Sequence, residues 1–143
     1  MRIEEKIRTA LLSMSAVTAL VGGGAAAHIR PDVPDKDDPR DGELILIEVD
    51  SEPRENTLDG KSAWVPADVT LVCRAPTRAR SRALAEAVCD NGTDPGTGLA
   101  GYNGSDWSAY LVSQSTTIGP DGKHPPTWYD VYLSFQFCFG ESR

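Results

Sequence analysis

Hydrophobic and polar positions follow two different periods along the chain, and the change of period separates predicted helices from predicted strands. Near the start, apolar residues recur every three or four positions with polar residues between them: Ile3, Ile7, Leu11 and Met14. This spacing is typical of an amphipathic helix that packs on a core. Ser15 can cap a short further turn over 16–21, which the glycines at 22–24 would end.

Four later stretches have the composition or the alternation of β-strands. The run 43–50 is apolar and rich in β-branched residues, which predicts a strand covered on both faces. The stretches 67–75 and 107–116 are the next two predicted strands. The clearest alternation is at 128–139, where the apolar positions are Tyr129, Val131, Leu133, Phe135, Phe137 and Phe139. We interpret this aromatic stripe as the core face of a sheet, because no basic residue interleaves with it as in a base-stacking platform.

A second helix is predicted after Pro76 and Thr77, with Ala83, Leu84, Ala87 and Val88 on one face. The predicted order is helix, strand, strand, helix, strand, strand. This order favours one α+β domain over 1–143, a mainly antiparallel sheet of about four strands with two helices packed on one face. A short edge strand can begin at Ile29, and Asp59-Gly60 is a hairpin-turn signal. Long loops are expected at 28–42, 51–66, 90–106 and 117–127.

Charge and cysteine content limit the classes of function. The 143 residues carry a formal net charge of -7, which argues against a protein that mainly grips phosphate backbones. Cys73, Cys89 and Cys138 lack CxxC spacing, so we expect neither a disulfide framework nor a zinc site, and a reducing, intracellular setting. No apolar stretch approaches the roughly 20 residues of a membrane span.

The N-terminal region has some features of a secretory signal, with Arg2, Lys6 and Arg8 before an apolar run and alanines at 25–27. Glu4 and Glu5 interrupt the basic part, and the helical period argues for a helix that packs on the domain. A secreted domain cleaved after Ala27 is the alternative.

Residues with obvious chemistry are few. The sequence contains no G-x-S-x-G, HExxH or Walker pattern. His28 and His124 have no second ligand at metal-binding spacing, and Asp35–Asp38 lack the glycine and distal glutamate of a calcium loop. We therefore expect no enzyme, no cofactor and no metal site. An alternative from another class is a small cytoplasmic domain that binds an acidic or metal ligand at Asp35–Asp38.

Arginine is concentrated at the start of the second predicted helix, at Arg74, Arg78, Arg80 and Arg82. We interpret Arg78 and Arg82 as the solvated side of an amphipathic helix, with Glu86 placed to pair with Arg82. Arg80 can lay its stem across the edge of the apolar face. Positive charge in a first turn opposes the helix dipole by about 0.3–1 kcal/mol per charge. A second hypothesis is therefore an acidic neighbour, such as another copy of this acidic chain.

Several segments together resemble the tail-completion family of long-tailed bacteriophages, which comprises tail terminators or tail-to-head joining proteins. They are "IRTALLSMSAVTALVGG", the following "RP", "NTLDGKSAWVPADVTLVCRAPTRARSRALAEAV" and the closing aromatic strand. The resemblance covers nearly the whole chain, and "SAVTALVGG" and "TRARSRALAEAV" are its most specific parts. The loops 90–106 and "PDVPDKDDPRDG" depart from the family pattern.

The resemblance implies a structural virion protein at the head–tail interface, assembled in the host cytoplasm. Members form a six-membered ring on the last ring of the tail tube, stop tube growth and present a surface to the head. The implied partners are copies of the chain, the tail tube protein and a head-completion or connector protein, with genomic DNA passing through unbound and no membrane. A head-closure or minor tail protein is the alternative. Candidate contact residues are Arg78, Arg82, Asp59, Lys61 and Trp64.

Overall fold

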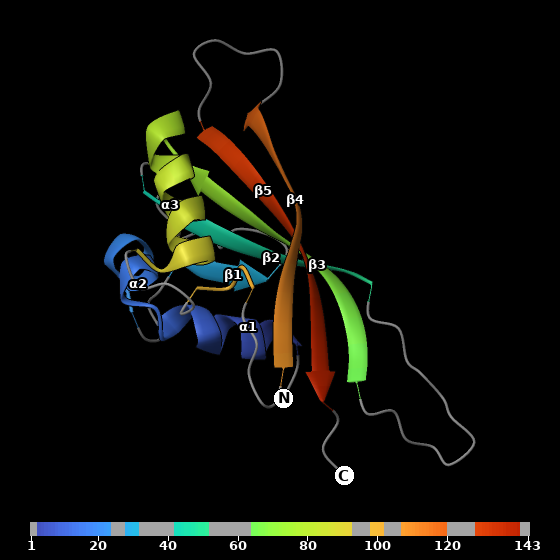
Figure 1. Ribbon diagram of the computed structural model, residues 1–143. Helices are drawn as coiled ribbons and strands as arrows, with labels where there is room; N and C mark the ends of the chain where they lie inside the picture. Colours follow the sequence, from blue (N-terminus) through green and yellow to red (C-terminus); the bar gives the residue numbers. More distant parts are fainter. Residues whose placement is uncertain are drawn as a thin grey trace, which may run out of the picture.

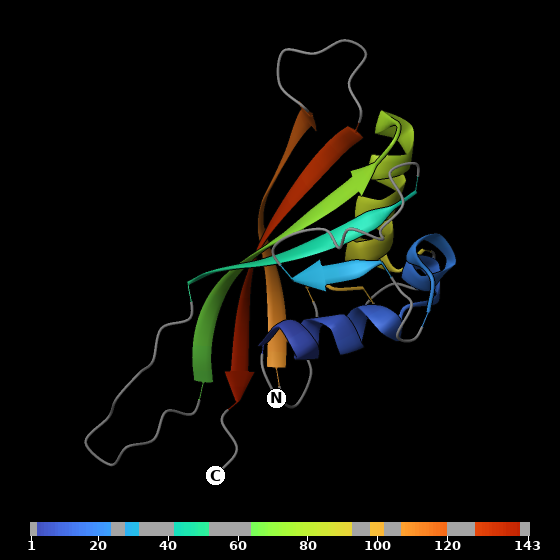
Figure 2. The ribbon, with the colours of Figure 1, turned by 180° about the vertical axis from the view of Figure 1, so that it is seen from behind.

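The computed structural model describes residues 3–23, 28–31, 42–51, 64–92, 98–101, 107–119 and 128–140. Five strands form one twisted sheet in the order β1-β2-β3-β5-β4, and the helices lie on one face of it (Figures 1 and 2). Neighbouring strands are antiparallel except for β1 and β2, which are parallel. The predicted α+β class with a mainly antiparallel sheet is confirmed. In chain order the elements are α1 (Ile3–Leu12), α2 (Ser15–Val21), β1 (Ile29–Pro31), β2 (Leu44–Ser51), β3 (Trp64–Ala75), α3 (Arg78–Asp90), β4 (Trp107–Gly119) and β5 (Trp128–Gly140).

The number of elements differs from the prediction, since the described residues contain five strands and three helices. The first predicted helix ends at Leu12, and the short turn predicted over 16–21 is a helix of its own, because Met14 between them has an extended backbone, with φ -93° and ψ 113°. Met14, and not Ser15, is therefore the N-cap residue of α2, and it makes no side-chain capping bond. The additional strand is β1, which pairs with β2 from Ile29 onward. Its pairing is preceded by a hydrogen bond in which Ile45 N donates to His28 O.

Two of the predicted loops are shorter than expected because strands extend into them. β2 includes Ser51 and β3 begins at Trp64, which shortens the loop expected at 51–66 from both ends. β4 continues to Gly119 inside the range 117–127, because its ladder with β5 runs on to Trp128. The predicted turn at Asp59-Gly60 lies outside the described residues.

The core lies between the helices and one face of the sheet. The alternation in β3 and β5 sends every second side chain to this face, where Phe135 and Phe137 are fully buried with ring centroids 5.6 Å apart. The aromatic stripe is thus a core face, as predicted. Burying each such side chain contributes about 1.5–3 kcal/mol. The helices contribute Ile7, Leu11, Met14, Val17, Val21, Leu84, Ala85, Ala87 and Val88.

On α3 the buried face is rotated slightly from the predicted one. Ala83, which was expected on the apolar face, is exposed, while Ser81 and Ala85 are buried. The Ser81 hydroxyl donates to Arg78 O at 2.9 Å, which satisfies this polar group in a buried position. The buried face of α3 therefore combines small residues with the larger Leu84 and Val88.

β2 is buried on both faces at its start, as its continuous apolar run predicts. Ile45 and Ile47 join the main core, while Leu44 and Leu46 form a second cluster with Val72 on the opposite face. Elsewhere that opposite face is largely polar, because β3, β5 and β4 direct acidic, hydroxyl and amide side chains to it. They include Asp68, Thr70, Ser134, Gln136, Ser113 and Ser115.

Candidate functional site

The four arginines at 74–82 lie where β3 ends and α3 begins, and Arg74 is the most tightly bound of them. It lies directly opposite Asp130 in the ladder between β3 and β5. Its Nε donates to Oδ1 at 2.8 Å and its Nη2 to Oδ2 at 3.0 Å. The guanidinium also lies over the Trp128 ring, 4.5 Å from the centroid. Because the Asp130 side chain is only 3% exposed, this two-bond pair is what satisfies its charge.

Arg78 is the first residue of α3, and its side chain connects the helix to two strands. Its Nη1 donates to Asp130 O and its Nη2 to Thr117 O, both at 3.0 Å. The guanidinium lies 5.1 Å from the centroid of the Tyr129 ring. The interpretation of Arg78 as a solvated residue is therefore wrong: it is half-buried, and it joins α3 to β5 and β4 through carbonyl oxygens.

Arg80 forms an ion pair with Glu43, the residue that precedes β2. Glu43 is 8% exposed, whereas the Arg80 side chain stays half-exposed. The pair holds the start of β2 against α3. Within the first turn of α3, the positive charge is thus met by groups of the same chain: Arg80 by the Glu43 carboxylate and Arg78 by two carbonyl oxygens. An acidic neighbour is not needed to explain Arg74, Arg78 and Arg80.

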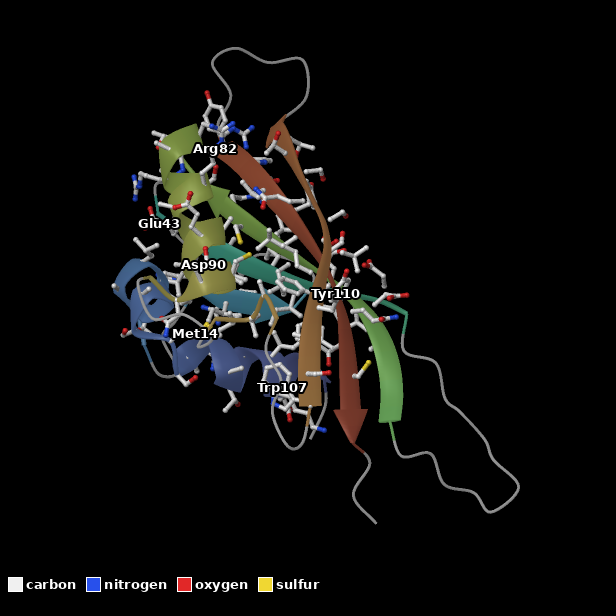
Figure 3. The ribbon with its side chains drawn as sticks, in the orientation of Figure 1. Met14, Glu43, Arg82, Asp90, Trp107 and Tyr110 are labelled. Carbon is white, nitrogen blue, oxygen red and sulfur yellow. The ribbon has the colours of Figure 1, made fainter. Side chains whose placement is uncertain are left out.

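Arg82 differs from the other three arginines because it is exposed and makes no ion pair with the described part of the chain. The pairing predicted between Arg82 and Glu86 is not found there. Arg82 lies at the N-terminal half of α3, and Asp90 at its other end (Figure 3). Between α3 and β4 is an open groove of about 300 Å³, lined by Arg82, Ala85, Glu86, Cys89, Asp90, Ala100, Leu111 and Gln114.

Three of the five predicted contact residues are in the described part of the chain. Arg78 and Arg82 lie at the start of α3, while Trp64 begins β3 opposite Gly140, at the far end of that strand. Asp59 and Lys61 lie outside the described residues. Of the two arginines, Arg82 is exposed and Arg78 is half-buried, and the five residues as a contact set stay a prediction.

Sequence reasoning missed the two acidic partners, Asp130 and Glu43. In the alternating pattern of 128–139, Asp130 is one of the polar positions, and Glu43 is the first residue of the strand predicted at 43–50. The sign that could have shown them is a charged residue inside an otherwise apolar run. Even so, their partners follow only from the strand register and from how α3 lies on the sheet.

Two of the thiols, those of Cys73 and Cys89, are not activated for chemistry. Burial raises the pKa of the Cys73 thiol far above its usual range, with smaller contributions from Cys89 and Asp130. Burial, with a smaller contribution from Asp90, raises the pKa of Cys89 to about 11. Because the thiolate is the reactive form, neither thiol is activated as a nucleophile. In the described ranges, no group of three or more His, Cys, Asp or Glu side chains could hold a metal ion. No described helix is long and apolar enough to cross a membrane.

Comparison with known proteins gives a similarity of fold. No family model matches the sequence, and no curated protein matches it. Among solved structures, the chain is similar to a chain of the virion of a native gene transfer agent (GTA) particle, with a TM-score of 0.64 and 15% identity. The match covers 97% of this chain and 95% of that one. It shows that the two chains share a fold over nearly their whole lengths.

Proposed function

We propose that the chain is a structural protein of a phage-like virion and acts as its tail terminator. In this role six copies form a ring on the last ring of the tail tube, stop its growth and join the tail to the head. The observation that carries the proposal is the shared fold with a chain of the GTA virion, over nearly the full length of both chains. A fold match that leaves out no domain on either side favours a common structural role.

The resemblance to the tail-completion family is a second support, because it rests on sequence segments. It supplies the finer statement, the position at the tail end, which the fold match to the GTA virion does not give. It also supplies the partners: further copies of the chain, the tail tube protein and a head-side connector.

The charges of the described residues suit such a role. The buried acidic groups and three of the four clustered arginines bind one another or the backbone, so they stabilise the subunit and do not form a reactive site. The net charge of -7 would keep DNA from adhering to a ring through which it passes. The proposal therefore describes an assembly protein and no enzyme.

Deletion of the gene from its phage, followed by electron microscopy of the tails, tests the proposal. We expect tails of excessive or scattered length, detached from heads, and recovery of normal particles when the wild-type gene is supplied in trans. Tails of normal length left unattached would overturn the terminator role and place the protein on the head side of the joint. Normal virions would overturn the virion role altogether.

A further inference from the structure

The two edges of the sheet differ in how they are protected against pairing with another strand. β1 is only three residues long and ends in Pro31, which has no N–H to offer. The carbonyl of Ile29 accepts a hydrogen bond from Arg8 Nε at 3.4 Å. A short strand, a proline and a covering charged side chain are the devices by which natural sheets prevent edge pairing.

The opposite edge, β4, is neither short nor interrupted by proline, and the one charged contact given for its backbone is near its end, where Arg78 Nη2 donates to Thr117 O. It is thirteen residues long, from Trp107 to Gly119, and contains no proline and no charged residue. In the described part of the chain its only neighbour in the sheet is β5. One bulge, between Leu111 and Ser113, interrupts the ladder, but from Ser113 to Gly119 the register is unbroken. A long, regular edge without charges or proline is a template for another strand.

The side chains of β4 also indicate a covered surface. The exposed large hydrophobic residues of the described chain are Tyr110 and Val112, at 67% and 61%, and both lie on this strand. Every residue from Val112 to Thr117 is exposed. Gln114 and Leu111 of β4 also line the groove beside α3, so the groove adjoins the β4 edge of the sheet.

We propose that β4 pairs with β4 of a second copy of this chain, antiparallel, about a two-fold axis near Ser115. Two chains that each carry a net charge of -7 repel one another over most of their surfaces. At β4 this repulsion is weakest, because neither strand has a charged residue there. β1 of the second copy is a poor occupant, since its proline and the Arg8 contact protect it.

The position of α3 is compatible with this arrangement. Arg78 bonds to Thr117 O, so the N-terminal end of α3 lies level with the last residues of β4. A two-fold axis perpendicular to the sheet keeps both α3 helices on the same face and reverses the direction of the second. Arg82, Glu86 and Asp90 of both copies then lie on the same face of the joined sheet, with the two β4 strands between the helices, because α3 packs on β3 and β5.

This contact goes beyond the proposed function and does not depend on it. A two-fold contact uses the same surface on both copies and closes at two, so it cannot by itself build a six-membered ring. It describes the free protein, in which each copy covers the edge of the other.

The test compares wild-type chain with Ser115→Lys by sedimentation equilibrium over a wide range of concentration. Wild type is expected to dimerise. Ser115→Lys places like charges next to each other at the axis and should weaken dimerisation by roughly tenfold or more. Gln136→Lys is the matched control, because it adds the same charge to the same sheet face on β5, away from the edge. Mixing Ser115→Lys with Ser115→Glu should restore association, since position 115 meets itself.

Amide hydrogen exchange gives a second measurement, with residues 113–117 protected at high concentration in wild type and unprotected in Ser115→Lys. A wild type that stays monomeric, or a Ser115→Lys variant that dimerises like wild type, would overturn the contact. If wild type forms six-membered rings and Ser115→Lys abolishes them, β4 is a ring contact; the two-fold contact is then wrong while the proposed function stands. The gene deletion tests the function separately, so the two can fail independently.

Discussion

Arg74 and Asp130 face each other across β3 and β5 and form two parallel hydrogen bonds, from Nε to Oδ1 at 2.8 Å and from Nη2 to Oδ2 at 3.0 Å. The carbonyl of Asp130 also accepts a hydrogen bond from Arg78. Asp130 is therefore bound by both β3 and α3, which follow one another along the chain. A carboxylate buried in a sheet is costly unless it is paired and hydrogen-bonded, and here both conditions are met. The pair therefore ties β3 to β5, and the Arg78 bond to the Asp130 carbonyl holds the start of α3 at the same point of the sheet.

Removing the guanidinium of this pair should destabilise the fold strongly. Arg74→Ala leaves the Asp130 carboxylate buried without its cation, and we expect a loss of about 3–5 kcal/mol in the free energy of unfolding. Urea unfolding followed by circular dichroism measures it. Arg82→Ala is the control and should stay within about 0.5 kcal/mol, because Arg82 is exposed. Equal effects of the two substitutions would contradict the pairing.

Arg78 and Arg82 should behave differently when each is reversed to glutamate. Arg78→Glu removes two bonds to carbonyls and places an acidic group against them, so we expect a loss of about 2–4 kcal/mol. Arg82→Glu should leave stability unchanged to within about 0.5 kcal/mol. Thermal unfolding of the two variants checks this prediction.

The different stabilities expected for Arg78→Glu and Arg82→Glu decide which of the two variants can test a contact role. Only Arg82→Glu can probe assembly without unfolding the subunit. If this variant is folded and assembles with the efficiency of wild type, the prediction that Arg82 contacts a neighbour is wrong.

The periodic parts of the structure could be predicted from the sequence, because period depends on local burial. Val69 and Leu71 in β3 and Phe135 in β5 face the core as their alternation predicts. What could not be predicted depends on register between distant segments. Asp130 and Arg74 are 56 positions apart, and Glu43 and Arg80 are 37 apart. Of the two arginines predicted to be solvated, Arg82 is exposed, whereas Arg78 donates to the carbonyls of Asp130 and Thr117.

Helix capping gives a direct comparison between a correct and an incorrect prediction. The Thr77 side chain accepts from Arg80 N at 3.2 Å, as the start predicted at Pro76-Thr77 requires. Thr77→Ala should lower the free energy of unfolding by about 1 kcal/mol. Ser15 is the first residue of α2 and not its cap. Ser15→Ala should therefore change the free energy of unfolding by no more than a few tenths of a kcal/mol. Chemical denaturation of both variants measures the difference, and a larger effect at Ser15 would contradict the observed cap.

The buried thiols predict slow and pH-dependent labelling. The pKa of Cys89 is raised to about 11, so its thiolate fraction, and the rate of alkylation, should rise roughly tenfold per pH unit until that value is approached. Cys73 should react only after unfolding, because it is fully buried. Timed alkylation followed by peptide mass spectrometry measures both rates, with urea-unfolded protein as the reference. Rapid labelling of Cys73 in the native chain would contradict its burial.

The raised pKa of Cys89 also affects the stability of the fold at high pH. The folded chain holds the Cys89 proton more tightly than the unfolded chain, whose thiols have the ordinary pKa of 9.0. The stabilisation that comes from this difference is complete below pH 9 and is lost as the pH rises toward 11. Cys89→Ala should therefore show a smaller decrease in melting temperature over this range than wild type.

Gly98 packs against the C-terminal end of α3, and any side chain there would collide with the helix backbone. A Cβ at this position would lie 2.6 Å from Asp90 N and closer still to the carbonyl of Cys89. These are rigid groups, because the next residues, Leu99 and Ala100, donate backbone hydrogen bonds to Val88 O and Cys89 O. Gly98→Ala should therefore cost about 1–3 kcal/mol or displace the turn. Gly23→Ala is the control, since nothing lies within 4 Å of its added methyl group. Equal melting temperatures for the two variants would show that the turn does not pack against α3 as described.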